Sequence, residues 1–209
     1  MNSGVAYPML ENEVMQRAVT GLTYTGKQAL GVYGAFALTS LAHELGHAAA
    51  AGLLYGPDRV LGFSYGGYCD DQEIGKKFLH IKSSNPRQMA AYLDLPEANS
   101  TPNKIKNFTI SAVGPLAGTL TAAYFFSKIF PNNDMKILEN LPIALTLAYC
   151  APSNYFNLLD LNPKKYGGFE TDGYRMSKIL SADRENFNDT IRIIGAVGCM
   201  GYLYTRFKE

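Results

Sequence analysis

The chain has 209 residues, a length that suits one domain or one compact bundle of helices. Its 19 basic and 18 acidic side chains leave a net charge of +1, without the basic stripe that nucleic-acid binding needs, so we expect no nucleic-acid partner. The three cysteines are far apart and odd in number, which argues against a disulfide framework and against a cysteine-based metal site.

Residues 1–27 are predicted to form an N-terminal amphipathic or surface segment, with a short helix over residues 10–20. The next run, from Gln28 to Tyr55, is rich in alanine and leucine and predicts a long helix. This helix is expected to end at Gly56-Pro57, because proline cannot continue the hydrogen-bond ladder.

The character of the chain changes between residues 58 and 106, which we predict to be a strand and loop insertion. Two short apolar and aromatic runs, residues 58–71 and 76–84, are broken by glycines and charged clusters and are typical of strands with turns. Three prolines between residues 86 and 102 then predict a polar loop.

Two apolar segments follow, residues 107–127 and 140–159, and both predict helices. We expect the second to be interrupted by its two prolines, Pro142 and Pro152. Interruptions of apolar helices are tolerated where the freed backbone groups meet other helices or a water-filled cavity, which favours a site near Pro152. A polar turn over residues 160–172 leads to another predicted helix, with Thr171 or Asp172 as its N-cap.

The distribution of charge suggests a membrane protein. Residues 28–57 contain only His43, Glu44 and His47 as strongly polar ionisable groups, and residues 107–127 and 140–159 contain none. Each stretch is long enough to cross a bilayer, which needs about 20 apolar residues, whereas a fourth, residues 193–205, is short. The prediction is a mainly α-helical, multi-pass integral membrane protein. Three or four spanning helices would form a polytopic transmembrane bundle with a small membrane-associated β element. The mean hydropathy of −0.08 also permits a soluble protein with an apolar core helix.

The segment His43-Glu44-Leu45-Gly46-His47 carries the clearest chemical signal. Positions i and i+4 lie on one helix face, so His43 and His47 can present two imidazole nitrogens to one zinc ion. Glu44 would then face the open position of that ion and take a proton from a water held there. An accidental match is disfavoured because burying Glu44 without a partner in an apolar helix costs several kcal/mol.

A catalytic zinc usually has three protein ligands, so one more is required. His80 is the only other histidine, and it lies in the strand-like region, where an exposed structural role is the simpler interpretation. Asp172 lies in a Thr-Asp-Gly turn after the interrupted apolar segment, where its carboxylate can reach into a cleft; its alternative role is the helix cap.

In this order of motifs the chain resembles the site-2 protease family of intramembrane zinc metalloproteases. The resemblance rests on HELGH at 43–47, GPLAG at 114–118, Asn157, and the pair Asp172-Gly173, and covers roughly residues 28–180. The glycines of GPLAG also form a small-xxx-small pair, for which we favour a packing role.

The resemblance implies that His43, His47 and Asp172 bind zinc, that Glu44 is the general base, and that Asn157 helps to hold substrate or an oxyanion. Asp160 is a rival third ligand, because the interval between Asn157 and Asp172 is longer than is typical of the family.

The resemblance further implies that residues 28–209 form a membrane-embedded metalloprotease core, whose sheet, around residues 60–82, pairs with an extended substrate. The expected function is zinc-dependent endopeptidase action on a membrane-protein substrate within the lipid bilayer. Two alternatives stay open: a soluble zinc metallopeptidase, and a non-catalytic membrane protein that binds or regulates a partner. The sequence leaves the substrate, the topology and the oligomeric state open.

Overall fold

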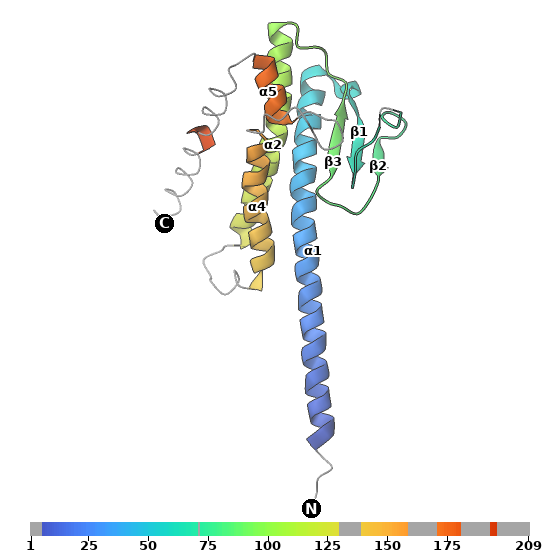
Figure 1. Ribbon diagram of the computed structural model, residues 1–209, viewed down its shortest axis with the longest axis vertical. Helices are drawn as coiled ribbons and strands as arrows, with labels where there is room; N and C mark the ends of the chain where they lie inside the picture. Colours follow the sequence, from blue (N-terminus) through green and yellow to red (C-terminus); the bar gives the residue numbers. More distant parts are fainter. Residues whose placement is uncertain (1–5, 71, 130–138, 159–170, 181–192, 196–209) are drawn as a thin grey trace, which may run out of the picture.

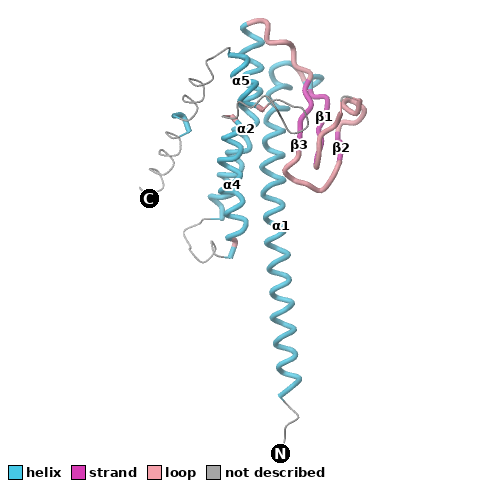
Figure 2. Tube along the Cα trace, in the orientation of Figure 1, coloured by secondary structure: helices cyan, strands magenta, loops and turns pink. Residues whose placement is uncertain are grey.

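The computed structural model describes residues 6–70, 72–129, 139–158, 171–180 and 193–195. Within these ranges the protein is mainly helical with one small sheet, which confirms the coarse fold class (Figure 1). The helices α2, α4 and α5 lie on one side of the long helix α1, and the sheet lies on its other side (Figure 2).

Helix α1 (Ala6–Tyr55) is a single continuous helix of 50 residues. It contains both the helix expected at 10–20 and the one expected at 28–55, so the chain has no structural break at residue 27. The side chains of residues 15–27 are all exposed, and this end of α1 projects beyond the other helices (Figure 1). The helix ends where expected, and Gly56 adopts a φ of 111°, which glycine tolerates best.

The sheet follows a short 3-10 turn, η1 (Pro57–Arg59), and has the strand order β2-β1-β3. The central strand β1 (Val60–Tyr65) pairs in parallel with β2 (Leu79–Ile81) and antiparallel with β3 (Met89–Leu93). Strands β1 and β2 lie within residues 58–71 and 76–84, the two runs predicted to form strands, and so confirm that prediction.

The third strand, β3, lies where the sequence predicted a loop. Its residues, Met-Ala-Ala-Tyr-Leu, favour helix as much as strand by local propensity, so the pairing with β1 decides its conformation. The buried Tyr92 ties the strand to the rest of the sheet: its hydroxyl accepts the Cys69 amide at 2.6 Å and lies 3.0 Å from the Ser64 hydroxyl.

Helix α2 (Thr101–Ile129) is the central helix, packing against α1, α4 and α5. The predicted interruption of helix α4 (Leu141–Asn157) does not occur. Pro142 lies in the first turn, where backbone amides have no partner within the helix, and α4 continues past Pro152. A small core joins the three long helices, formed by the buried residues Ala35, Ala122, Leu147 and Cys150.

Among the described residues, α2 is the one helix long and apolar enough to cross a membrane. Because α2 is also the central helix of the fold, its apolar character equally suits a protein core. Helix α4 has 17 residues, fewer than a typical span. The segment predicted at 193–205 lies almost entirely outside the described residues. A bundle of three or four spanning helices therefore stays a prediction.

Candidate metal centre

The two histidines of the motif lie one turn apart on α1, and both are 8% exposed. The third member of the group is Asp172, the first residue of α5 (Asp172–Leu180), which is 7% exposed. The Nε2 atoms of His43 and His47 are 3.1 Å apart. The carboxylate oxygens of Asp172 lie 3.2 Å from Nε2 of His43 and 3.4 Å from Nε2 of His47. Residues 129 positions apart thus meet at one buried point.

The hydrogen bonds on the other side of each ring fix which nitrogen faces this point. Nδ1 of His43 lies 2.8 Å from Oδ1 of Asn154, and Nδ1 of His47 lies 2.7 Å from the carbonyl oxygen of Ile110. Both partners only accept, so each Nδ1 carries a proton and donates it. The assignment for Asn154 is consistent with its other contact, since its Nδ2 donates to the Cys150 carbonyl at 2.9 Å. In the neutral imidazoles both Nε2 atoms are therefore lone-pair donors that face the Asp172 carboxylate.

Thr171 and Asn157 hold Asp172 in place. The Thr171 hydroxyl accepts the Tyr174 amide at 3.2 Å, so Thr171 is the N-cap of α5 and Asp172 is left for the buried group. The Asn157 Nδ2 donates to Oδ2 of Asp172 at 2.7 Å. Burial alone would raise the pKa of the Asp172 carboxyl, but the adjacent His47 and His43, which attract and hydrogen-bond the carboxylate when their Nε2 atoms are protonated, hold that pKa well below its ordinary value. Asp172 is accordingly an anion.

Glu44 lies beside this group and also contacts the sheet. Its Oε1 is 4.0 Å from Nε2 of His43, while its Oε2 accepts the backbone amide of Ala91, in β3, at 2.7 Å. The Glu44 side chain is 17% exposed and lines a cavity of about 490 Å³ together with His43, Asn154 and Asn157. One face of the buried group is therefore open to a cavity, and the carboxylate of Glu44 lies at that face.

Glycines make the close approach of the helices at this site possible. A Cβ on Gly114 would lie 2.2 Å from Nε2 of His47, and one on Gly118 would lie 2.6 Å from Oδ1 of Asn154. A Cβ on Gly46 would meet the Val113 carbonyl at 2.9 Å. The structure confirms the packing role predicted for the Gly114–Gly118 pair. The side chains that pack against these two glycines, His47 and Asn154, belong to the site itself.

The structure thus brings together four of the residues singled out in the sequence: His43, Glu44, His47 and Asp172. Asn157 is also there, through its bond to Asp172. His80 lies in β2, on the far side of β1 from β3, and does not belong to the group. Asp160, the rival ligand, lies outside the described residues.

Sequence reasoning missed two supporting groups, the Asn154 side chain and the Ile110 carbonyl. Asn154 had a weak signal, as a polar residue two positions after Pro152 in an otherwise apolar run. The Ile110 carbonyl had none, because any residue supplies a backbone oxygen.

This donor set, two imidazole nitrogens and a carboxylate, could hold a metal ion. Three acceptors cannot lie within about 3.4 Å of one another without a shared proton or cation between them, because their lone pairs repel. Comparisons of the chain with protein-family models, with curated proteins and with solved structures find no match.

Proposed function

We propose that the protein is a zinc-dependent intramembrane endopeptidase. The observation that carries this proposal is the convergence of His43, His47 and Asp172 on one buried point, with the carboxylate of Glu44 at its open face. The order of motifs shared with the site-2 protease family supports the same function.

The spacing of the three ligand atoms favours zinc. Ligands about 2.0–2.1 Å from a tetrahedral ion lie about 3.3 Å from one another. The three ligand-atom distances in this site, 3.1, 3.2 and 3.4 Å, agree with such a tetrahedron. Three protein ligands of nitrogen and oxygen with one open position are typical of catalytic zinc, which lowers the pKa of a bound water and polarises a carbonyl.

Glu44 supplies the base. Its carboxylate reaches the open face of the site, where it can accept a proton from the attacking water and later return that proton to the leaving amine. The Ala91 amide holds one of its oxygens, which fixes the side chain and leaves the other oxygen toward the site.

The same contact supports β3 as the strand that a substrate would join. The Ala91 amide points away from β1, and the backbone groups of Met89 and Leu93 share that side because they alternate along a strand. A peptide that paired with the backbone groups of Met89 and Leu93, on either side of the amide that Glu44 occupies, would be extended, with its carbonyls exposed to the site. The sequence pointed instead to residues 60–82, but β1 in that region is paired on both sides and β2 lies at the far edge.

Exposed apolar side chains on the long helices support a membrane setting with the lipid bilayer as a partner. Leu53 on α1 is 87% exposed, Leu120 on α2 is 68% exposed, and Leu145 on α4 is 61% exposed. Such side chains on three neighbouring helices would be covered by lipid. If alkaline carbonate releases the protein from membranes, the soluble metallopeptidase is favoured instead.

Replacing the base tests the mechanism. Glu44→Gln should abolish cleavage of membrane-spanning peptides in detergent micelles while leaving about one zinc per chain, measured by elemental analysis. Glu139→Gln, an exposed glutamate just before α4, is the matched control and should cleave like the wild type. Full activity of Glu44→Gln, or a wild-type protein that binds no zinc, would refute the proposal.

A further inference from the structure

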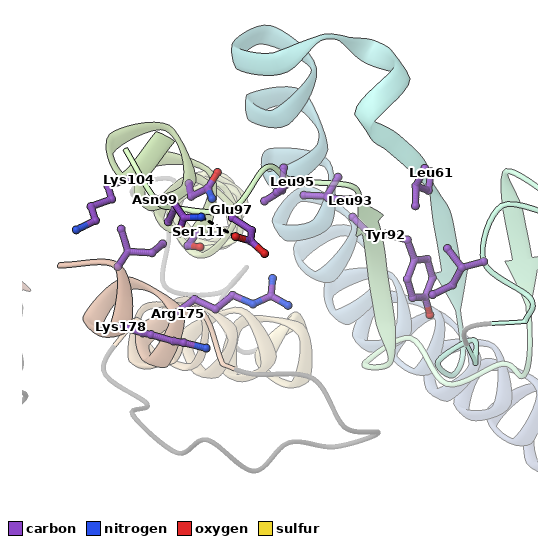
Figure 3. Close-up of a pocket in the computed structure, with 15 residues that line it drawn as sticks. Leu61, Tyr92, Leu93, Leu95, Glu97, Asn99, Lys104, Ser111, Arg175 and Lys178 are labelled. Atoms are coloured by element: carbon purple, nitrogen blue, oxygen red, sulfur yellow. Dashed lines mark hydrogen bonds between the residues drawn. The ribbon is translucent and has the colours of Figure 1, made fainter. Parts of the chain in front are cut away.

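The three-stranded sheet is attached to the helices at one end by apolar contacts. Val60 at the start of β1 pairs with Leu93 at the end of β3, so both chain connections from the sheet to the helices lie at this end. Together with Leu95, these residues pack against a buried cluster that includes Ala50 of α1. In Figure 3, Leu93 and Leu95 lie beside α1, in the wall of a cavity of about 770 Å³. We call this end of the sheet the anchored end.

The other end of the sheet, where β3 begins, is held by exposed polar and aromatic contacts. The hydroxyl of Tyr65, the last residue of β1, is hydrogen-bonded to the Tyr33 hydroxyl on α1. The guanidinium of Arg87 lies 5.3 Å from the ring centre of Phe36 on α1 and 5.8 Å from that of Tyr149 on α4. It also donates a hydrogen bond to the Tyr149 hydroxyl at 3.2 Å. We call Arg87, Phe36 and Tyr149 the clip.

The backbone around Arg87 belongs to the sheet. The Arg87 amide donates to Oδ1 of Asn85 at 3.1 Å, and the next carbonyl, that of Gln88, accepts the Gly66 amide at 2.6 Å. Gly66 directly follows β1, so Arg87 moves with the sheet, and its side chain links the sheet to both helices. Because Arg87 and Tyr149 are exposed to water, this link is weaker than a buried cation–π contact.

The candidate metal centre lies between the two ends of the sheet. The cavity of about 490 Å³ that opens on Glu44 is walled by the clip and by Met89 of β3. On α1, Glu44 lies between Phe36 of the clip and Ala50 at the anchored end. The sheet therefore covers the face of the site at which Glu44 lies.

Glu44 also occupies the edge of β3 that a substrate strand would need. The Gln88 carbonyl and the Asp94 amide both bond residues that flank β1, so by alternation the backbone groups of Ala91 point the other way, toward α1. The Ala91 amide donates to Oε2 of Glu44 at 2.7 Å. A carbonyl of a paired strand would need that same place, because it would bond the amide at about 2.9 Å. A peptide can pair along the whole of β3 only after the sheet has moved away from α1.

We propose that the sheet is a lid over the metal centre, which pivots at the anchored end and is held closed by the clip. Opening breaks the contacts of Arg87 and the hydrogen bond between Ala91 and Glu44. It frees the edge of β3 for an extended peptide and releases both oxygens of the base. The role in substrate entry rests on the proposed function, whereas the movement of the lid can be measured without any substrate.

Hydrogen exchange of single amides, on the full chain in detergent micelles with zinc added, tests the movement. Arg87→Met keeps a long side chain without the charge and should speed exchange of the Ala91 amide about fivefold, as expected when an exposed cation–π contact is lost. The amides of Ala90 and Tyr92 should keep their rates, because both residues pair with β1 and the lid moves as one body. Lys128→Met is the matched control. It removes a cation–π contact of 5.3 Å within α2 and should leave the exchange of Ala91 unchanged.

A reversible cross-link tests whether substrate entry needs the movement. The double variant Tyr33→Cys/Tyr65→Cys is joined by a bis-maleimide that contains a disulfide, so that a reductant releases the lid again. The cross-linked protein should cleave a membrane-spanning peptide about tenfold more slowly, and the reductant should restore the rate. Each single variant, treated in the same way, is the control for the native cysteines and should keep its rate.

The outcomes separate the lid from the peptidase. Equal exchange of Ala91 in Arg87→Met and in the wild type overturns the lid, whatever the protein cleaves. Faster exchange of Ala90 and Tyr92 as well would mean that the sheet unfolds, which also overturns it. A cross-linked protein that cleaves at the full rate refutes the role in substrate entry. If exchange behaves as expected but the wild type cleaves no peptide, the lid stands and the peptidase proposal fails.

Discussion

Asn154 orients one of the proposed zinc ligands without touching the metal position. Its Oδ1 accepts the Nδ1 proton of His43 at 2.8 Å, which turns Nε2 of that ring toward His47 and Asp172. We predict that Asn154→Leu, which keeps the branched shape of the side chain but has no acceptor, weakens zinc binding.

The size of the effect follows from the kind of contact that is lost. Removing the hydrogen-bond partner of a metal-bound histidine typically lowers metal affinity 10- to 100-fold, which corresponds to about 1.4–2.7 kcal/mol. We expect a loss in the upper half of this range, because the buried Nδ1 proton of His43 would have no other acceptor among the described residues once Asn154 is replaced. Asn154→Asp keeps the acceptor and adds a negative charge, so zinc affinity should be retained or increased.

Zinc affinity is measured by competition against a chromophoric chelator at fixed pH. The control is Thr146→Ala on the same helix, because the Thr146 hydroxyl bonds the Pro142 carbonyl of its own helix and lies about two turns from Asn154. Thermal unfolding of the chelator-treated proteins shows whether each variant folds without metal. If folded Asn154→Leu binds zinc within twofold of the wild type, the orienting role of Asn154 is wrong.

Two further predictions concern how the helices position the ligands. Gly114→Ala should displace the His47 ring and lower zinc affinity at least tenfold in the chelator assay, because the new Cβ would lie 2.2 Å from Nε2. The control is Gly21→Ala, because nothing lies within 4 Å of its new Cβ. This variant should leave zinc binding unchanged and stabilise the exposed helix by about 1 kcal/mol. A similar loss of zinc affinity in both variants would contradict the packing argument. Thr171→Ala should cost about 1 kcal/mol of unfolding free energy and weaken zinc binding, whereas Thr171→Ser should restore both, since the lost contact is the N-cap beside the ligand. Unchanged denaturant midpoints for Thr171→Ala would exclude that role.

The fold illustrates where local signals suffice. The C-terminal end of α1 was predictable because Gly56 and Pro57 stop a helix whatever surrounds it. Strand β3 was not, because its five residues have no strand preference of their own and become a strand only by pairing with β1. The predicted interruption of α4 at Pro152 was wrong for a related reason. Tertiary packing lets the helix continue although Pro152 has no backbone amide to donate a hydrogen bond.

The sequence by itself determined the two histidines and Glu44, because a spacing of four residues on any helix places His43 and His47 on the same face. It also named Asp172, but only as one carboxylate among alternatives. Tertiary structure decided the rest: that α5 brings Asp172 to the two imidazoles, that Asn154 and Ile110 fix the rings, and that β3 reaches Glu44. These contacts join residues 47 to 129 positions apart, and only the packing of the helices and the sheet can bring such residues together.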